Sequence, residues 1–258
     1  MKAIFQSWRA IMHFDINLVG LGLAICLALV HISASRSRWL LKIPQRWWVS
    51  IAGGVSITYI FLDVLPELSH AQEAIKDSSV GMIAYLENHV YLLALLGLAI
   101  FYGLEKLALR SRTHRAQHQG EDTTHPGIFW VHIISFASYN LILGYLLRES
   151  EGHGLIACLL LFIALALHFA VNDINLREHH KRMYDRWGRW ALAGAIVLGW
   201  ALGEALHLEE AGILAAWALV AGGLILNVLK EELPGEDESH FGFFFAGATM
   251  YAVVLLAV

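Results

Sequence analysis

Charged residues are scarce in this sequence, since Asp, Glu, Lys and Arg together make up only 16% of its 258 residues. A soluble domain has about 25% charged residues, whereas 57% of this chain is hydrophobic. The formal net charge of −4 is also too small to indicate a nucleic-acid partner. The composition therefore argues against an ordinary soluble protein and predicts one whose main solvent is the lipid bilayer.

Cysteine is rarer still, with two residues in the whole chain, and both lie in apolar segments. Cys26 and Cys158 are therefore expected to be packing residues rather than a disulfide, which would need an oxidising, aqueous setting. The chain also lacks a CxxC metal motif, an HExxH motif and a phosphate-binding P-loop. These absences argue against a metalloenzyme and an ATP-driven pump. We expect a protein that is not an enzyme and has no organic cofactor.

Eight segments are long and apolar enough to cross a bilayer, for which roughly 20 residues are needed. They lie near residues 16–35, 47–66, 89–109, 128–148, 154–175, 188–207, 211–231 and 240–258. The first, from Ile16 to Ala34, is longer than the h-region of a cleaved signal peptide, which has about 7–15 residues, so we expect it to stay as a span. The sequence thus predicts an all-α, polytopic integral membrane protein with a single transmembrane domain over residues 1–258 and eight transmembrane helices.

Basic residues favour alternate connections, and this bias predicts orientation because cytoplasmic loops collect Lys and Arg. The first, third and fifth connections are basic, whereas the sixth has no Lys or Arg. The acidic seventh departs from the alternation, but acidic residues carry little weight in this rule. The pattern predicts both termini outside the cytoplasm, in a cell or inner membrane. It also predicts a cytosolic loop over residues 110–127, where His114, His118 and His125 could bind a metal weakly.

Two carboxylates stand one helical turn apart in the second span. Asp63 and Glu67 are at i and i+4 and so project from one face of the helix, with Pro66 between them. An ionisable residue inside a span costs about 2.5–3.5 kcal/mol on insertion scales, so it usually faces a pathway or a partner. Proline removes a backbone donor, and a kink at Pro66 would free carbonyl oxygens that can bind a cation or water. Glu67 has a second interpretation, a position at the outer interface where charge costs little.

The fifth span carries polar residues in an otherwise apolar helix. His168 and Asn172 are at i and i+4, and Asp173 follows directly. An imidazole, an amide oxygen and a carboxylate that converge are suitable ligands for a first-row divalent metal. The alternative interpretation is a buried histidine that only bonds a backbone carbonyl.

Two further features of the spans have a predicted role. Glu204 in the sixth span is either a pathway carboxylate or an interfacial residue. The glycine pairs at 53–54 and 222–223 are expected to allow close helix approach, as small residues do in membranes.

Residues 53–68, GGVSITYIFLDVLPEL, resemble the second helix of the ZIP family of divalent-metal transporters, in which a glycine-rich start leads to a deep polar residue and a Leu-Pro-Glu ending. Residues 222–234, GGLILNVLKEELP, are similar to that family's seventh helix in the gap between its small-residue pair and its proline. The third span ends in GLEKLALR before a basic, histidine-containing loop, which is also similar. The resemblance implies a ZIP-like bundle of eight helices with outside termini.

The fourth and fifth spans depart from the metal-binding motifs of that family. Its fourth helix has a His-Asn-x-x-Asp-Gly pattern, and SFASYN, placed there, puts Ser135, Phe136, Tyr139 and Asn140 at the four named positions. Its fifth helix has His-Glu-x-Pro-His-Glu, against which HFAVND keeps the first His and has Asn and Asp at the last two positions. The resemblance therefore implies one remaining metal site from spans two, five and six, with the ligands His168, Asn172, Asp173, Asp63, Glu67 and Glu204.

Two functions follow from these patterns. The first is a ZIP-like transporter that moves a divalent cation, zinc before iron or manganese, towards the cytoplasm along existing gradients, with the bilayer and the metal ion as its partners. The second is a protein of the same fold that has lost metal transport and acts as a sensor, as a partner of another membrane protein or as a carrier of another solute. Phe136 and Tyr139 favour the second, because they stand where the family has ligands. The sequence leaves the oligomeric state open, a homodimer included.

Overall fold

A computed structural model of the chain describes residues 2–33, 45–76, 90–120, 122–206, 210–232 and 240–257. These residues are mostly helical, and no strand occurs among them. In chain order the elements are α1 (Lys2–Ser33), α2 (Gln45–Tyr59), η3 (Ile60–Val64), α3 (Leu65–Lys76), α5 (Val90–Gln119), α6 (Pro126–Ser150), η4 (Glu151–His153), α7 (Leu155–His180), η5 (Tyr184–Gly188), α8 (Arg189–Ala205), α9 (Glu210–Asn227), η6 (Val228–Glu232) and α10 (Phe241–Leu256).

Five of the described helical stretches are long and apolar enough to cross a membrane, namely Trp47–Glu73, Val90–His118, Pro126–Ser150, Leu155–His180 and Gly212–Lys230. Two shorter apolar stretches, Leu18–Ser33 and Phe241–Leu256, accompany them. The predicted all-α fold is confirmed for the described residues, and these helices are suited to an integral membrane protein. The number of eight spans and the ZIP-like bundle stay predictions.

The third span is followed by more helix than the sequence predicts. Helix α5 continues to Gln119, so residues 110–119 extend the helix instead of belonging to a loop. No glycine or proline interrupts this segment, and the helix ends at Gly120, whose φ of 68° suits a glycine just beyond a helix end. The next helix begins at Pro126, after His125, whose side chain accepts a hydrogen bond from the Gly127 N–H. The connection between α5 and α6 is therefore short.

The second span contains a wide π turn at Ile60–Val64, directly before Pro66. Pro66 has no N–H, so the carbonyl of Leu62, four residues earlier, cannot receive the usual helical bond. The N–H of Leu65 donates to the carbonyl of Ile60, five residues back. The distortion expected at the proline is therefore present, and it includes Asp63. Such turns are frequent at functional sites.

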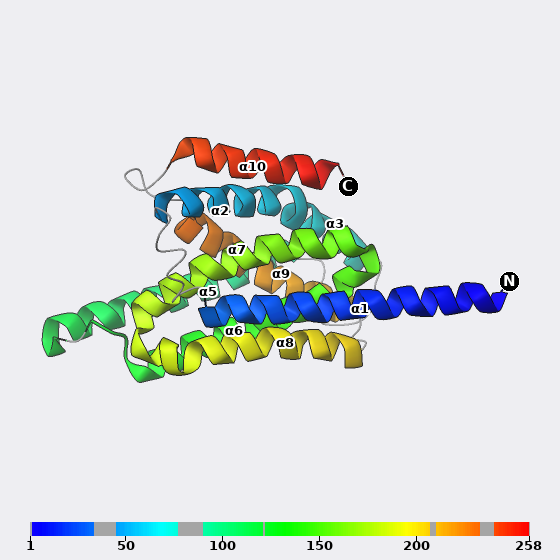
Figure 1. Cartoon of the computed structure of the whole chain (residues 1–258). Helices are drawn as coiled ribbons and strands as arrows, with labels where there is room; N and C mark the ends of the chain where they lie inside the picture. The colour runs from blue at the N-terminus through cyan, green and yellow to red at the C-terminus, as the bar shows by residue number, and fades with distance from the viewer. Residues whose placement is uncertain are drawn as a thin grey trace.

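Three pairs of helices pack through reciprocal glycines: α2 with α10, α5 with α9, and α6 with α8. In Figure 1, α10 lies beside α2, and α8 lies beside α6. In each pair, a Cβ atom on a glycine of either helix would fall within 2.5 Å of a backbone oxygen of the other, at Gly54 and Gly247, Gly97 and Gly222, and Gly144 and Gly199. The predicted close approach at the 53–54 and 222–223 pairs is confirmed for Gly54 and Gly222. Backbone contact at this distance is possible only without a side chain.

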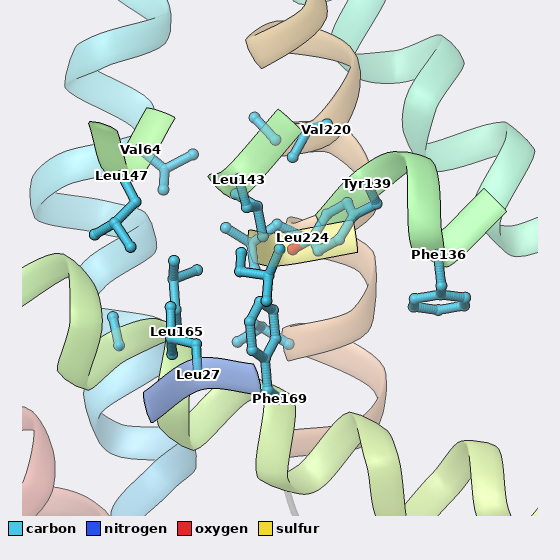
Figure 2. Close-up of a cluster of buried hydrophobic side chains, with 14 of the residues drawn as sticks. Leu27, Val64, Phe136, Tyr139, Leu143, Leu147, Leu165, Phe169, Val220 and Leu224 are labelled. Carbon is cyan, nitrogen blue, oxygen red and sulfur yellow. The ribbon is translucent and has the colours of Figure 1, made fainter. Parts of the chain in front are cut away.

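The apolar core lies where α1, η3, α6, α7 and α9 meet. Figure 2 shows part of it, with labelled side chains from all five elements and Leu224 near the centre of the view. The labelled residues are Leu27, Val64, Phe136, Tyr139, Leu143, Leu147, Leu165, Phe169, Val220 and Leu224. Several of these belong to the same helices as the buried polar residues described below.

Candidate functional site

Asp173 of α7 is the central polar residue of the bundle, with none of its surface exposed. Its two carboxylate oxygens lie 2.9 and 3.1 Å from Nδ1 of His31 on α1, which is equally buried. The hydroxyl of Tyr184, in η5, donates to Oδ1 at 2.5 Å. One carboxylate thus joins α1 to α7 and to η5, the turn that follows α7. A buried charge of this kind persists only when it is paired and hydrogen-bonded.

The second nitrogen of His31 extends this network to α6. Nε2 lies 3.0 Å from Oδ1 of Asn140, whose Nδ2 donates to the Phe136 carbonyl at 2.8 Å. Because the Asn140 oxygen can only accept, His31 Nε2 carries a proton in this arrangement. His31 Nδ1 faces the carboxylate of Asp173, so one further proton is shared between those two groups. The ring of His31 also stacks on Phe169, with 4.3 Å between centroids.

His168 and Asn172 lie next to this centre on α7, and both are buried. The Tyr139 hydroxyl is 3.3 Å from His168 Nε2, which places a phenol of α6 between the two helices. Asn172 Nδ2 is buried without a hydrogen-bond partner. An unsatisfied buried donor costs about 1–3 kcal/mol, so this amide is held by its surroundings at some expense in stability. The three residues predicted from the fifth span therefore all point into the protein.

The carboxylates predicted from the second and sixth spans lie in other settings. Asp63 is half-buried and accepts a hydrogen bond from Tyr59, one turn earlier. Glu67 is exposed. Glu204 is also exposed and is bound by Arg148, whose Nε lies 2.6 Å from its Oε2. Within the described parts of the chain, no three His, Cys, Asp or Glu side chains are grouped so as to hold a metal ion. The structure therefore brings together His168, Asn172 and Asp173, and it does not add Glu67 or Glu204 to them.

A second buried carboxylate, Glu151, follows the last residue of α6. Trp200 Nε1 donates to its Oε1 at 2.7 Å, and Arg148 Nη1 lies 3.1 Å from its Oε2. Burial raises the pKa of the Glu151 carboxyl above its ordinary value, while the Trp200 bond and the charge of Arg148 act in the opposite direction. A Cβ at Gly20 of α1 would fall 1.6 Å from Oε1, so α1 packs directly on this carboxylate. Glu151 therefore connects α1, α6 and α8.

The sequence analysis predicts neither His31 nor Asn140 as a site residue. Asn140 is a polar residue in an otherwise apolar span, and the structure places it in hydrogen bonds with His31 and with the Phe136 carbonyl. His31 stands near the end of an apolar segment, where nothing in the sequence separates it from an interfacial histidine.

Comparison of the chain with protein-family models, with curated proteins and with solved structures gave no match.

Proposed function

We propose that this protein is a membrane transporter for a divalent cation, zinc in the first place, with Asp173 as the residue that anchors the ion. The observation that carries the proposal is a fully buried carboxylate within hydrogen-bond distance of an imidazole from another helix. Ionisable groups at such a position in membrane proteins are expensive and are usually retained for transport or proton transfer. In the proposed topology the chain has eight spans in a ZIP-like bundle, both termini lie outside, and the cation moves towards the cytoplasm.

The residues around Asp173 supply the ligand types that zinc prefers. His31 and His168 offer ring nitrogens, and Asn140 and Asn172 offer amide oxygens. Nitrogen and oxygen ligands in a mixed set bind zinc less tightly than a complete set of thiolates or imidazoles, which suits an ion that must be released. In the described arrangement, His31 is hydrogen-bonded to the Asp173 carboxylate. A cation would therefore bind this carboxylate as His31 moves away from Asp173. The half-buried Asp63, within the π turn, is proposed to lie on the route to this centre.

Zinc uptake into proteoliposomes tests the proposal. Purified protein should give saturable uptake above that of empty vesicles. A Glu204→Gln variant serves as the matched control, because Glu204 is an exposed carboxylate in a surface ion pair with Arg148. Loss of an exposed pair changes stability by about 0–1 kcal/mol, so this variant should transport zinc at close to the rate of the unmodified protein. Uptake no faster than in empty vesicles, for zinc, manganese and iron alike, would contradict the proposal.

A second candidate function, a protein of the same fold that does not carry metal, has one specific observation in its favour. Tyr139 lies against His168, so the α6 position beside this imidazole is occupied by a phenol. On that view the His31–Asp173 pair stabilises the fold and moves no ion. The two functions differ in a simple measurement: the second predicts that no divalent cation changes the unfolding temperature of the purified protein.

A further inference from the structure

Helix α5 presents a continuous exposed face that ends in two cations. Among the five candidate spans, the stretch Val90–His118 of this helix has the smallest buried share, 22% of its most apolar window. Residues 92, 95, 99, 102, 106 and 110 are all exposed and recur at spacings of three and four, so they share one face of the helix. They are Leu92, Leu95, Ala99, Tyr102, Lys106 and Arg110. The face is therefore apolar along the span and basic at its end.

The two cations stand where α5 changes from apolar to polar. Residues 90–104 contain no charged side chain, whereas residues 111–119, SRTHRAQHQ, are polar apart from Ala116. Such a boundary is the level at which a helix that leaves the hydrocarbon region meets lipid headgroups, and long basic side chains reach that level from slightly deeper positions. Lys106 and Arg110, one helical turn apart, are therefore placed beside the phosphates of one leaflet.

An open groove surrounds these two cations. Among the described residues it is lined by Tyr102, Gly103, Lys106, Leu107, Leu109 and Arg110. A Cβ at Gly103 would meet no atom within 4 Å, so the groove is open at this position. The ammonium of Lys106 lies over the ring of Tyr102, 5.3 Å from its centroid, and this contact favours a side chain held along the groove. The groove therefore combines apolar side chains with two positive charges.

The nearest carboxylate in the chain leaves both cations available to a ligand. Glu105 precedes Lys106, but its Oε1 lies 2.8 Å from Lys230 Nζ and 3.3 Å from His179 Nε2, so its charge is already balanced by groups of η6 and α7. Within the described part of the chain, neither Lys106 nor Arg110 forms a salt bridge. Two neighbouring positive charges without a protein partner favour an external anion at this position.

We propose that this groove binds one anionic phospholipid, with the headgroup phosphate at Lys106 and Arg110 and an acyl chain along Leu92, Leu95 and Ala99. A guanidinium binds two phosphate oxygens at once, and an ammonium adds a compact charge. Basic residues at the cytoplasmic end of a span attract anionic lipids, and the basic third connection predicts that side for this end of α5. A soluble anion would leave the apolar part of the face uncovered, so the face favours a lipid. The proposal needs α5 in a membrane and is independent of metal transport.

Native mass spectrometry of the purified protein in detergent tests the site, with dioleoyl phosphatidylglycerol and dioleoyl phosphatidylcholine as probes that differ only in their headgroups. The unmodified protein should bind its first phosphatidylglycerol about tenfold or more tightly than phosphatidylcholine, since each basic residue near a membrane surface strengthens the attraction of anionic lipid about fivefold. A protein with both Lys106→Gln and Arg110→Gln should lose this preference. Inorganic phosphate should not displace the lipid, because it has no acyl chain.

The matched control carries Arg182→Gln and Arg186→Gln, which remove two exposed positive charges at the same end of the bundle but outside the groove. It should keep the preference for phosphatidylglycerol. Both double variants change only exposed side chains, so each should unfold without added lipid at the temperature of the unmodified protein. Equal affinity of the unmodified protein for the two lipids would overturn the proposal. A preference that survives Lys106→Gln with Arg110→Gln, that is lost equally in the control, or that inorganic phosphate abolishes would overturn it as well.

Discussion

Substitution of Asp173 by Asn is expected to abolish zinc uptake and to lower the free energy of unfolding by about 3 kcal/mol. The expected size follows from the complete burial of the Asp173–His31 pair, because removing one partner of a buried pair is strongly destabilising. Tyr184 also loses a charged acceptor, and hydrogen bonds to charged groups contribute about 1.5–3 kcal/mol. Zinc uptake into proteoliposomes and thermal unfolding in detergent give the two readouts.

A double variant separates the functional part of this prediction from the structural part. Replacing His31 with Met and Asp173 with Leu removes both charges together, and apolar replacement of a buried pair is often neutral or stabilising. The doubly substituted protein should therefore recover most of the stability lost in Asp173→Asn and still carry no zinc. Transport by a folded protein that lacks both groups would show that the pair serves only the fold.

Substitution of Gly199 by Leu is expected to separate α6 from α8 and to cost about 3 kcal/mol or more, at the upper end of overpacking effects. A Cβ at this position would lie 2.0 Å from the Leu141 carbonyl oxygen, and the reciprocal Gly144 would place a Cβ 2.2 Å from the Ile196 oxygen. A backbone cannot yield as a flexible side chain does, so the helices must move apart. Thermal unfolding and the yield of monodisperse protein in detergent measure the effect.

Gly194 provides the control on the same helix, because a Cβ there meets no atom within 4 Å. Gly194→Ala should leave stability unchanged or raise it by up to about 1 kcal/mol, as expected for alanine in a helix interior. A Gly199→Leu protein that unfolds at the temperature of the Gly194→Ala protein would show that the α6–α8 contact is not tight.

Much of the helical architecture could be predicted, because bilayer thickness imposes a length on apolar segments and the segments are separated by polar connections. The end of α5 was harder to predict from the sequence. Residues 110–119 are polar, which indicates a loop, but they contain neither glycine nor proline, and a helix can continue beyond the membrane. The helix pairs could be predicted only in part. Glycine marks the positions of close approach, but the partner of Gly97, at Gly222, is far away in the sequence.

The interior direction of the fifth-span residues could also be predicted, because polar groups in an apolar helix avoid lipid. Their partners could not. Asp173 is bound by His31 across 142 positions, and Asn140 meets that same ring across 109. Such contacts depend on which faces of three helices meet, and helix periodicity alone does not specify that. Glu67 and Glu204 are both exposed, Glu204 beside Arg148, and the sequence leaves an interfacial position open for each of them. Their part in a metal site stays a prediction.

Calorimetric titration of the purified protein with zinc tests the role of Asp173 in binding most directly. The proposal predicts saturable binding by the unmodified protein and an affinity about 100-fold weaker for Asp173→Asn, since even residues that only support a metal ligand contribute 10–100-fold. Glu204→Gln should bind as the unmodified protein does. Equal affinity of the Asp173→Asn and unmodified proteins, or no heat of binding from either, would contradict a cation site at this carboxylate.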